Sequence, residues 1–373
     1  MGALRNVAVV AFAQAPIVAS DEHRMATEIL YPQVRRALAD CGVERDAIDY
    51  QVAGSADYVD GRPFGFVAAL DVLGTWPPRQ DLHLEMDAAF AAYYAWIRMQ
   101  AGDCDTALVC GYGKTSEGEP EHVLNLELDP YYQAPIGLTP TATAALQASA
   151  YMARTGATDR DLAGVAARNR QAGAKNPEAQ LRAPASADEL LRTPWVVEPL
   201  RKGYLPPIGD SAVCLVLAAE GKADAMCDRP AWVHGVDQRI ELQTLGARDL
   251  SRSAGARLAT EKALAMAGVS SARELDVVEL TATTPAEELI LREAMGLDGG
   301  GDRPAVNPSG GPLVAHPFMM TGLVRLGEAF RQLAGRAEGR AVLGARRALA
   351  HAAQGHCLQQ NLVFVLGSER RWT

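Results

Sequence analysis

The sequence predicts an α/β fold built from two similar halves. Short apolar runs that are typical of buried strands alternate along the chain with longer runs at helical spacing. A helix, loop and strand near the N-terminus recur in the C-terminal part, which indicates a duplication. The 373 residues are 48% hydrophobic and 22% charged, and this is enough apolar side chain for a large packed core.

The elements of the N-terminal part follow in order. An apolar run close to the N-terminus predicts a buried strand. Apolar residues at helical spacing then predict an amphipathic helix that ends at Gly42. A short strand, a long apolar helix ended by Gly102 and another buried strand come next. The predicted elements are 7–12 (strand), 22–41 (helix), 49–52 (strand), 87–100 (helix) and 106–110 (strand). Strands alternating with helices favour a largely parallel sheet.

The internal repeat joins residues 36–43 to residues 262–269. Each copy is an alanine-rich helix that ends at Gly-Val, followed by a polar loop and a strand introduced by aspartate, at Asp49 and Asp276. We interpret this as a duplicated fold with two pseudo-symmetric halves; chance similarity between alanine-rich helices is the alternative.

The repeat suggests three parts. Residues 1–112 together with 200–222 form an N-terminal half, and residues 223–373 form a C-terminal half. Residues 113–199 do not show the strand–helix alternation of the two halves and contain a predicted helix at 159–174. A long insertion in an α/β enzyme commonly covers a binding site.

Charge and cysteine content exclude several classes of protein. A net charge of −9 and a pI near 5.4 argue against nucleic acid as the main partner. The six cysteines form no C-x-x-C pair, so we expect reduced, buried thiols, no metal site and a cytoplasmic location. No apolar stretch approaches the roughly 20 residues that span a bilayer.

The tract from Asn307 to Pro317 is the most informative part of the sequence. Gly310 and Gly311 allow a tight turn and a close approach of the backbone to a ligand. Pro317 fixes the chain just after His316. A histidine at such a turn can donate a hydrogen bond to a carbonyl oxygen and stabilise an enolate there.

This tract, together with Cys357, resembles the second half of a thiolase active site. Cys357 stands where the family has its acid/base cysteine, and two other tracts support the resemblance: 158–177 is similar to the helix of the thiolase loop domain, and 206–212 to the turn that enters the second half. The chain therefore resembles the thiolase superfamily, in particular its lipid-transfer-protein or sterol-carrier-thiolase-like branch. The resemblance implies a five-layer αβαβα fold, usually dimeric, that binds coenzyme A thioesters.

Two departures from the family pattern concern its chemistry. Thiolases carry a nucleophilic cysteine where the long first-half helix begins, because thiolate attack forms an acyl-enzyme and the helix start lowers the thiol pKa. Here the turn contains Glu85 and Asp87 and no cysteine. Thr281 stands where the family has an asparagine that orients a water in the oxyanion hole, and it could hold a water in its place.

Three functions are compatible with these residues. The first is retro-aldol cleavage of a bulky, possibly steroid-derived, β-hydroxyacyl-CoA, in which His316 stabilises the enolate and Cys357 handles a proton near Cα. Some proteins of this branch are steroid side-chain aldolases that act with a small partner containing a zinc ribbon and an OB-fold. The second is a thiolase-type acyltransferase or condensing enzyme, and the third is a non-catalytic acyl-CoA or lipid-binding subunit.

The remaining site residues stay as candidates. Glu85 or Asp87 could serve as the base, since a helix start keeps a carboxylate ionised. Tyr131 and Tyr132 follow a turn in the insertion and could line the acyl pocket. The candidates for binding the thioester are Asn307, Gly310, Gly311, Tyr131, Tyr132 and Thr281. We expect coenzyme A to enter with the substrate, no permanently bound cofactor, and a homodimer.

Overall fold

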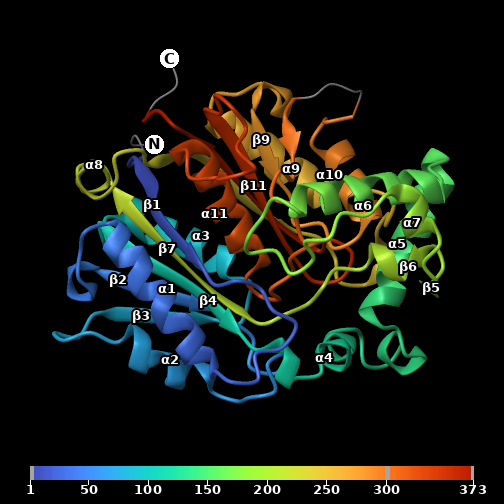
Figure 1. The fold of residues 1–373 in the computed structure, drawn as a ribbon, viewed down its shortest axis with the longest axis horizontal. Helices are drawn as coiled ribbons and strands as arrows, with labels where there is room; N and C mark the ends of the chain where they lie inside the picture. Colours follow the sequence, from blue (N-terminus) through green and yellow to red (C-terminus); the bar gives the residue numbers. More distant parts are fainter. Residues whose placement is uncertain (1–3, 299–302, 371–373) are drawn as a thin grey trace.

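The computed structural model describes residues 4–298 and 303–370. One mixed sheet runs through this part of the chain, and helices cover both of its faces (Figure 1). Its ten strands are β1 (Val7–Gln14), β2 (Tyr50–Gly54), β3 (Gln80–Leu84), β4 (Thr106–Gly113), β7 (Ser211–Ala219), β8 (Ala231–Ile240), β9 (Val277–Glu279), β10 (Ala305–Val306), β11 (Arg347–Gln354) and β12 (Gln360–Gly367). They lie in the order β10-β9-β11-β12-β8-β1-β7-β4-β2-β3.

The sheet consists of two halves with the same topology. In the N-terminal half β1 pairs antiparallel with β7, β7 antiparallel with β4, and β4, β2 and β3 are parallel. In the C-terminal half β8, β12, β11, β9 and β10 repeat this pattern in the same order. A short antiparallel contact, Ala8 to Trp232 and Val9 to Ala231, joins β1 to β8. The predicted duplication is confirmed.

The prediction of a largely parallel sheet is wrong. β12 follows β11 after a turn of only five residues, 355–359, and a connection that short can only return the chain in the opposite direction. β7 enters its half of the sheet after the long insertion and lies antiparallel to both of its neighbours. Only the pairs further out in each half are parallel.

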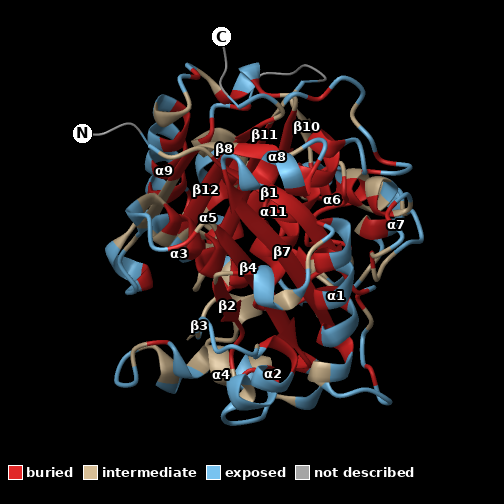
Figure 2. Ribbon diagram, turned by 90° about the vertical axis from the view of Figure 1, so that its left-hand side faces the viewer, coloured by how far each residue is buried: buried red, intermediate tan, exposed pale blue. Residues whose placement is uncertain are grey.

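The helices form three layers around the two half-sheets. α3 (Ala88–Ala101) and α11 (Thr321–Ala334) contact each other, and α11 contacts strands of both halves, so this pair is the central layer. All residues of α11 are buried, and Figure 2 shows this central region in red. α1 (Ala26–Asp40) and α2 (Gly65–Leu73) lie outside the N-terminal half, and α9 (Ala254–Met266) and α10 (Pro285–Ala294) outside the C-terminal half. The five-layer αβαβα arrangement is confirmed.

The insertion lies beside both halves and packs on α10 (Figure 1). It contains α4 (Pro120–Leu126), α5 (Pro140–Thr155), α6 (Asp159–Gly173), α7 (Ala187–Leu191) and β5 (Trp195–Val197). β6 (Leu200–Arg201), which pairs with β5, follows directly, and α8 (Lys222–Met226) follows β7. The division at 1–112 with 200–222, 113–199 and 223–373 remains our proposal for the domain boundaries.

Local sequence explains where the central elements begin. β4 and β7 are buried along their whole length, because each is covered on both faces. α3 starts at Ala88, one residue later than predicted, because the Asp87 side chain caps it by accepting a hydrogen bond from the Ala89 amide. α1 starts at Ala26 rather than residue 22, after Met25.

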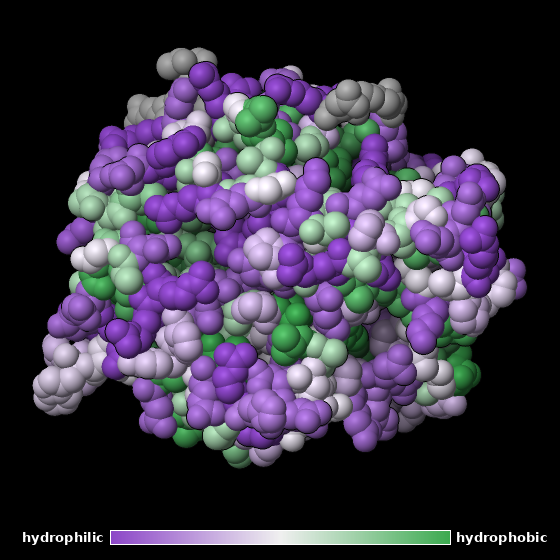
Figure 3. Space-filling view, in the orientation of Figure 1, coloured by the Kyte–Doolittle hydropathy of each residue, from purple (hydrophilic) through white to green (hydrophobic). Residues whose placement is uncertain are grey.

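Polar residues cover most of the face seen in Figure 3, and hydrophobic residues form small scattered groups. Within the described ranges, none of the helices has the length and apolar character needed to traverse a bilayer.

Candidate active site

A cavity of about 260 Å³ opens where the two central helices begin. Four of the predicted site residues line it: Asp87, Thr281, His316 and Cys357. They come from parts of the chain that are far apart in sequence, and the fold brings their side chains to one cavity.

His316 is held at the cavity by its backbone and by its ring. The His316 amide donates to the carbonyl oxygen of Pro207 at 3.2 Å, and the side chain is 6% exposed. Nδ1 of the ring lies 2.8 Å from Oγ1 of Thr321. Burial, with a smaller contribution from Arg325, lowers the pKa of His316 to about 4, so the imidazole is neutral at physiological pH.

The Thr321 hydroxyl controls which nitrogen of the neutral ring carries the proton. Its oxygen lies 2.8 Å from Nδ1 of His316 and 3.0 Å from the carbonyl oxygen of Pro317, and a hydroxyl has one proton to donate. When Thr321 donates to Nδ1, the ring proton is on Nε2, which can then donate into the cavity. When Thr321 donates to Pro317, Nδ1 donates to Thr321 and Nε2 becomes an acceptor.

Cys357 contributes a thiol on an unusual backbone. Its φ is +54° and that of Leu358 is +60°, a left-handed conformation that costs energy in residues other than glycine. Arg248 donates from Nη1 to the Cys357 carbonyl oxygen at 2.8 Å and so supports the turn. Sγ donates to the carbonyl oxygen of Thr143 at 3.3 Å. Burial and then nearby Glu287 raise the pKa of Cys357 to about 12, so the group is a thiol and not a thiolate.

Asp87 lies between the starts of the two central helices. Oδ1 accepts from the Ala89 amide at 2.8 Å, at the start of α3, and Oδ2 accepts from the Gly322 amide at 2.8 Å, at the start of α11. The two helix dipoles and these amides favour the carboxylate, whereas complete burial raises its pKa. Both oxygens are therefore engaged in holding the helices together.

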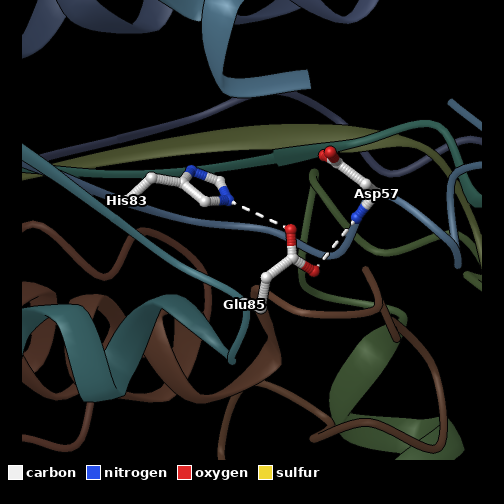
Figure 4. Close-up of side chains that lie close together, drawn as sticks. All are labelled: Asp57, His83 and Glu85. Atoms are coloured by element: carbon white, nitrogen blue, oxygen red, sulfur yellow. Dashed lines mark hydrogen bonds and ion pairs between the residues drawn. The ribbon is translucent and has the colours of Figure 1, made fainter. Parts of the chain in front are cut away.

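Glu85, the other predicted carboxylate, lies outside the cavity. Its side chain is 53% exposed and pairs with His83, Nε2 to Oε1 at 3.6 Å, and it accepts from the Asp57 amide at 3.3 Å (Figure 4). Of the two carboxylates offered as the base, Glu85 does not line this cavity and Asp87 does. Only two positions separate Glu85 from Asp87, but the chain turns into α3 between them and sends the two side chains in different directions.

The group of Asp57, His83 and Glu85 is also where a metal ion could be held. One ligand atom from each lies within 4.8 Å of the others. Asp57 Oδ1 accepts from the Gly65 amide at 3.0 Å, and the contacts within the group account for its arrangement. This group is separate from the residues that line the cavity.

The glycines of the 307–317 tract serve the fold and do not approach the cavity. A Cβ on Gly310 would lie 2.8 Å from the backbone of Gly173, at the end of α6, so the glycine permits close packing on the insertion. Asn307, whose φ is +49°, accepts from the Leu280 amide at 2.7 Å through Oδ1. None of the three predicted binding residues, Asn307, Gly310 and Gly311, lines this cavity.

The predicted tyrosines are elsewhere as well. Tyr131 and Tyr132 are each 82% exposed and do not line the cavity, because the turn at Asp129 directs both to the surface. The insertion contributes instead Thr143 and neighbouring small residues of α5.

Sequence reasoning missed Glu287, which lines the cavity from the first turn of α10. Its Oε2 accepts from the amide of Thr283 at 2.6 Å and from the Thr283 hydroxyl at 2.8 Å. Burial raises its pKa, and the hydrogen bonds from Thr283 oppose the rise. Two adjacent glutamates are common in the first turn of a helix, where they interact favourably with the helix dipole. No signal in the sequence therefore distinguishes Glu287.

A buried group of polar side chains that the sequence did not predict holds the 307–317 tract in place. Arg325 is fully buried and donates from Nη1 to Oε2 of Glu279 and to Oγ of Ser309, both at 2.6 Å. The Ser309 hydroxyl also donates to Glu279 at 2.7 Å. This buried group ties α11 and β9 to the tract that carries His316.

Comparison with known proteins agrees with this architecture. Residues 240–368 match the family described as thiolase C-terminal domain-like. An acetyl-CoA acetyltransferase of Methanothermobacter thermautotrophicus is 28% identical over 68% of this chain and 71% of its own length. Sterol carrier protein 2 of Gallus gallus is 26% identical over 85% of this chain and 63% of its length. A 17-hydroxy-3-oxo-4-pregnene-20-carboxyl-CoA lyase of Mycobacterium tuberculosis is 30% identical over 34% of this chain and 33% of its length.

Solved structures share the whole fold. The structure named Ltp2-ChsH2(DUF35) aldolase has a TM-score of 0.81 at 19% identity and covers 97% of both chains. Human mitochondrial 3-ketoacyl-CoA thiolase in complex with CoA has a TM-score of 0.77 at 16% identity and covers 98% of both chains. The matching C-terminal family, the relatives and the duplicated five-layer fold together support a thiolase-superfamily, sterol-carrier-thiolase-like protein.

Proposed function

We propose that this protein cleaves the Cα–Cβ bond of a β-hydroxyacyl-CoA thioester by a retro-aldol reaction, without an acyl-enzyme. The products are a ketone or aldehyde and a shortened acyl-CoA. The β-hydroxyl loses its proton, the Cα–Cβ bond breaks towards the thioester, and the enolate that results is stabilised and then protonated at Cα. Coenzyme A enters and leaves as part of the thioester.

The observation that carries this proposal is the identity of the residue at the start of α3. Asp87 occupies that position, and its two oxygens accept backbone amides of α3 and α11. Cys357 is the one cysteine among the described residues that line the cavity, and its pKa of about 12 keeps it protonated. A protonated thiol is a proton donor and a poor nucleophile, so the cavity suits an enolate better than an acyl-enzyme.

His316 takes the role of enolate stabiliser. Its neutral ring can present Nε2–H to the enolate oxygen when Thr321 donates to Nδ1. An enolate oxygen in the cavity would itself favour this tautomer, because it offers an acceptor to Nε2. Thr281, whose hydroxyl donates to the carbonyl oxygen of His351 at 2.9 Å, lies at the cavity and can help to hold a water there.

The comparisons support a lyase and also explain the alternative. One relative is named as a steroid-related CoA lyase, and one structure of the same fold is named as an aldolase. That structure's name includes a DUF35 component, which supports our expectation of a small partner with a zinc ribbon and an OB-fold. The acetyltransferase relatives support the second candidate, a thiolase-type acyltransferase.

We also propose that the chain forms a homodimer.

Free coenzyme A separates these two reactions. With a β-hydroxyacyl-CoA, we expect release of a ketone or aldehyde and one equivalent of shortened acyl-CoA, measured by chromatography, without added free coenzyme A. A thiolase consumes free coenzyme A when it cleaves a 3-ketoacyl-CoA, and we expect no such consumption here. The intact mass of the protein should not change during turnover. A covalent acyl adduct, or cleavage only when free coenzyme A is present, would favour the acyltransferase.

Thr321→Val tests how His316 is oriented. Valine has the shape of threonine but cannot hydrogen-bond to Nδ1, so the ring loses the partner that directs the proton to Nε2. A hydrogen bond worth about 1.5 kcal/mol corresponds to about a tenfold loss in kcat. Thr321→Ser keeps the hydroxyl and should retain most of the activity. Equal activity of the valine and serine variants, with similar thermal midpoints, would remove Thr321 from this role.

A further inference from the structure

We propose that Glu287 is the base that accepts the proton of the β-hydroxyl group in this cavity, and that it later returns this proton through Cys357. The inference deepens the proposed function and rests on it. It identifies the one carboxylate whose position fits the first step of the cleavage.

Glu287 is held firmly but keeps one oxygen free. Thr283 donates to Oε2 from its amide and from its hydroxyl, at 2.6 and 2.8 Å, which fixes the plane of the carboxyl group. Neither of these two hydrogen bonds uses Oε1, and the backbone of Thr284 is the further donor near the carboxyl group. The side chain lines the cavity although the residue is only 6% exposed. Oε1 is therefore available to a ligand.

The neighbouring Glu288 shows what a purely structural carboxylate looks like on this helix. It is fully buried and pairs with Arg168, and it accepts from Asn169 at 2.7 Å. Glu287 has no such cation: neither lysine nor arginine is among the described residues that line the cavity. A buried carboxylate without a cationic partner is costly for stability, and such groups are typical of functional sites.

The other carboxylates at the cavity and His356 are either engaged in hydrogen bonds or lie at its rim. Asp87 accepts helix amides with both oxygens. His356 uses both ring nitrogens, Nδ1 with the Thr143 hydroxyl at 3.0 Å and Nε2 with the carbonyl oxygen of Leu124 at 2.8 Å. Glu121 and Glu127 are exposed at the rim by α4, although neighbouring atoms desolvate Glu127 enough to raise its pKa. Glu287 alone combines enclosure with an unoccupied acceptor oxygen among these residues.

Burial makes Glu287 a stronger base than a surface glutamate, because it raises the pKa of the carboxyl group. Glu287 also lies close enough to Cys357 to raise the pKa of the thiol. Both residues line the cavity, so a proton acceptor and a proton donor face the same space.

The proton balance closes without another reactant. Oε1 of Glu287 takes the proton of the β-hydroxyl as the C=O bond forms, and the electrons of the Cα–Cβ bond pass to the thioester as an enolate. The Cys357 thiol then gives its proton to Cα, and the enolate electrons form the new C–H bond. Glu287 passes its proton to the Cys357 thiolate, so both groups return to their starting states.

Glu287→Gln is the direct test, because the amide oxygen can still accept from Thr283 while the base is lost. We expect kcat to fall by about 10² to 10⁴ with KM little changed. In the wild type, kcat/KM should decrease as falling pH protonates Glu287, and this acidic limb should be absent from the residual activity of the variant. Glu293→Gln, on the same helix but paired with Arg154 and Arg252 outside the cavity, is the matched control and should stay within about twofold of wild type.

Glu287→Ala provides a second, independent readout, since the space left by the side chain can admit formate. Partial recovery of cleavage with added formate, and none with added chloride, is expected of a missing base. If wild type cleaves the thioester and Glu287→Gln is equally fast, Glu287 is not the base and the retro-aldol function still stands. If wild type does not cleave any β-hydroxyacyl-CoA, both proposals are overturned.

Discussion

Replacement of His316 by alanine is expected to lower kcat for cleavage of a β-hydroxyacyl-CoA by at least 100-fold. The reason is the loss of the hydrogen bond from Nε2 to the enolate oxygen. A donor aimed at charge that develops in the transition state contributes about 10² to 10³ in kcat. KM should change less, because the interaction is made in the transition state more than with the bound substrate.

Two measurements separate this effect from a loss of structure. His316 is enclosed at the cavity, so alanine leaves a space and should lower the thermal midpoint moderately. His316→Gln fills most of this space and retains an amide N–H, and we expect its activity to lie between those of alanine and wild type. Activity of the alanine variant within about threefold of wild type would exclude His316 from the reaction.

The pH dependence distinguishes His316 from Glu287. The pKa of His316 is lowered to about 4, so its ring stays neutral as the pH falls from 8 to 5. Protonation of His316 therefore cannot produce an activity change in that range. The pKa of Glu287 is raised, so a loss of activity on acidification is expected to come from this carboxyl group and to disappear in Glu287→Gln.

The fold could be predicted where burial on both faces leaves a continuous apolar run. β1 and β4 have this pattern and are predicted from it. β11 is not, because its sequence Arg347–Gln354 is rich in alanine, the strongest helix former. Its pairing with β9 and β12 makes it a strand. Strand direction also escaped prediction, since it depends on where the insertion returns the chain.

The candidate site could be predicted only in part, for a geometric reason. His316 and Cys357 stand in tracts whose composition is unusual, so sequence could single them out. The carboxylates stand in ordinary contexts: Glu85 and Asp87 precede a helix, and Glu287 and Glu288 begin one. In each pair one side chain faces the cavity and the other faces away. That difference arises from the direction of a turn or a helix face, which local sequence does not specify.

Of the tract on which the resemblance depends, His316 lines the cavity and Gly310 does not. Gly310 was expected to let the backbone approach a ligand, and it lets the backbone approach Gly173 instead. This packing of Gly310 against the end of α6 fixes the tract that carries His316. A small residue in a site can thus act on chemistry through packing alone.

The largest effect on stability is expected from Arg325→Met, which breaks the fully buried pair with Glu279. The two side chains meet at 2.6 Å and neither is exposed. Removal of the guanidinium leaves the Glu279 carboxylate uncompensated in the core, at a cost of about 3 to 5 kcal/mol in the free energy of unfolding. Guanidinium chloride unfolding, followed by circular dichroism, would measure the change. A loss below about 1 kcal/mol would contradict the assignment.

The double variant Arg325→Met with Glu279→Gln identifies the cause. Glutamine removes the unpaired charge and can still accept from the Ser309 hydroxyl, so we expect it to recover at least half of the lost stability. Activity should not recover to the same degree, because the Arg325 guanidinium also holds Ser309 in the 307–317 tract. If stability recovers and activity does not, the main role of the buried pair is to position His316 at the cavity, and its contribution to the stability of the fold is secondary.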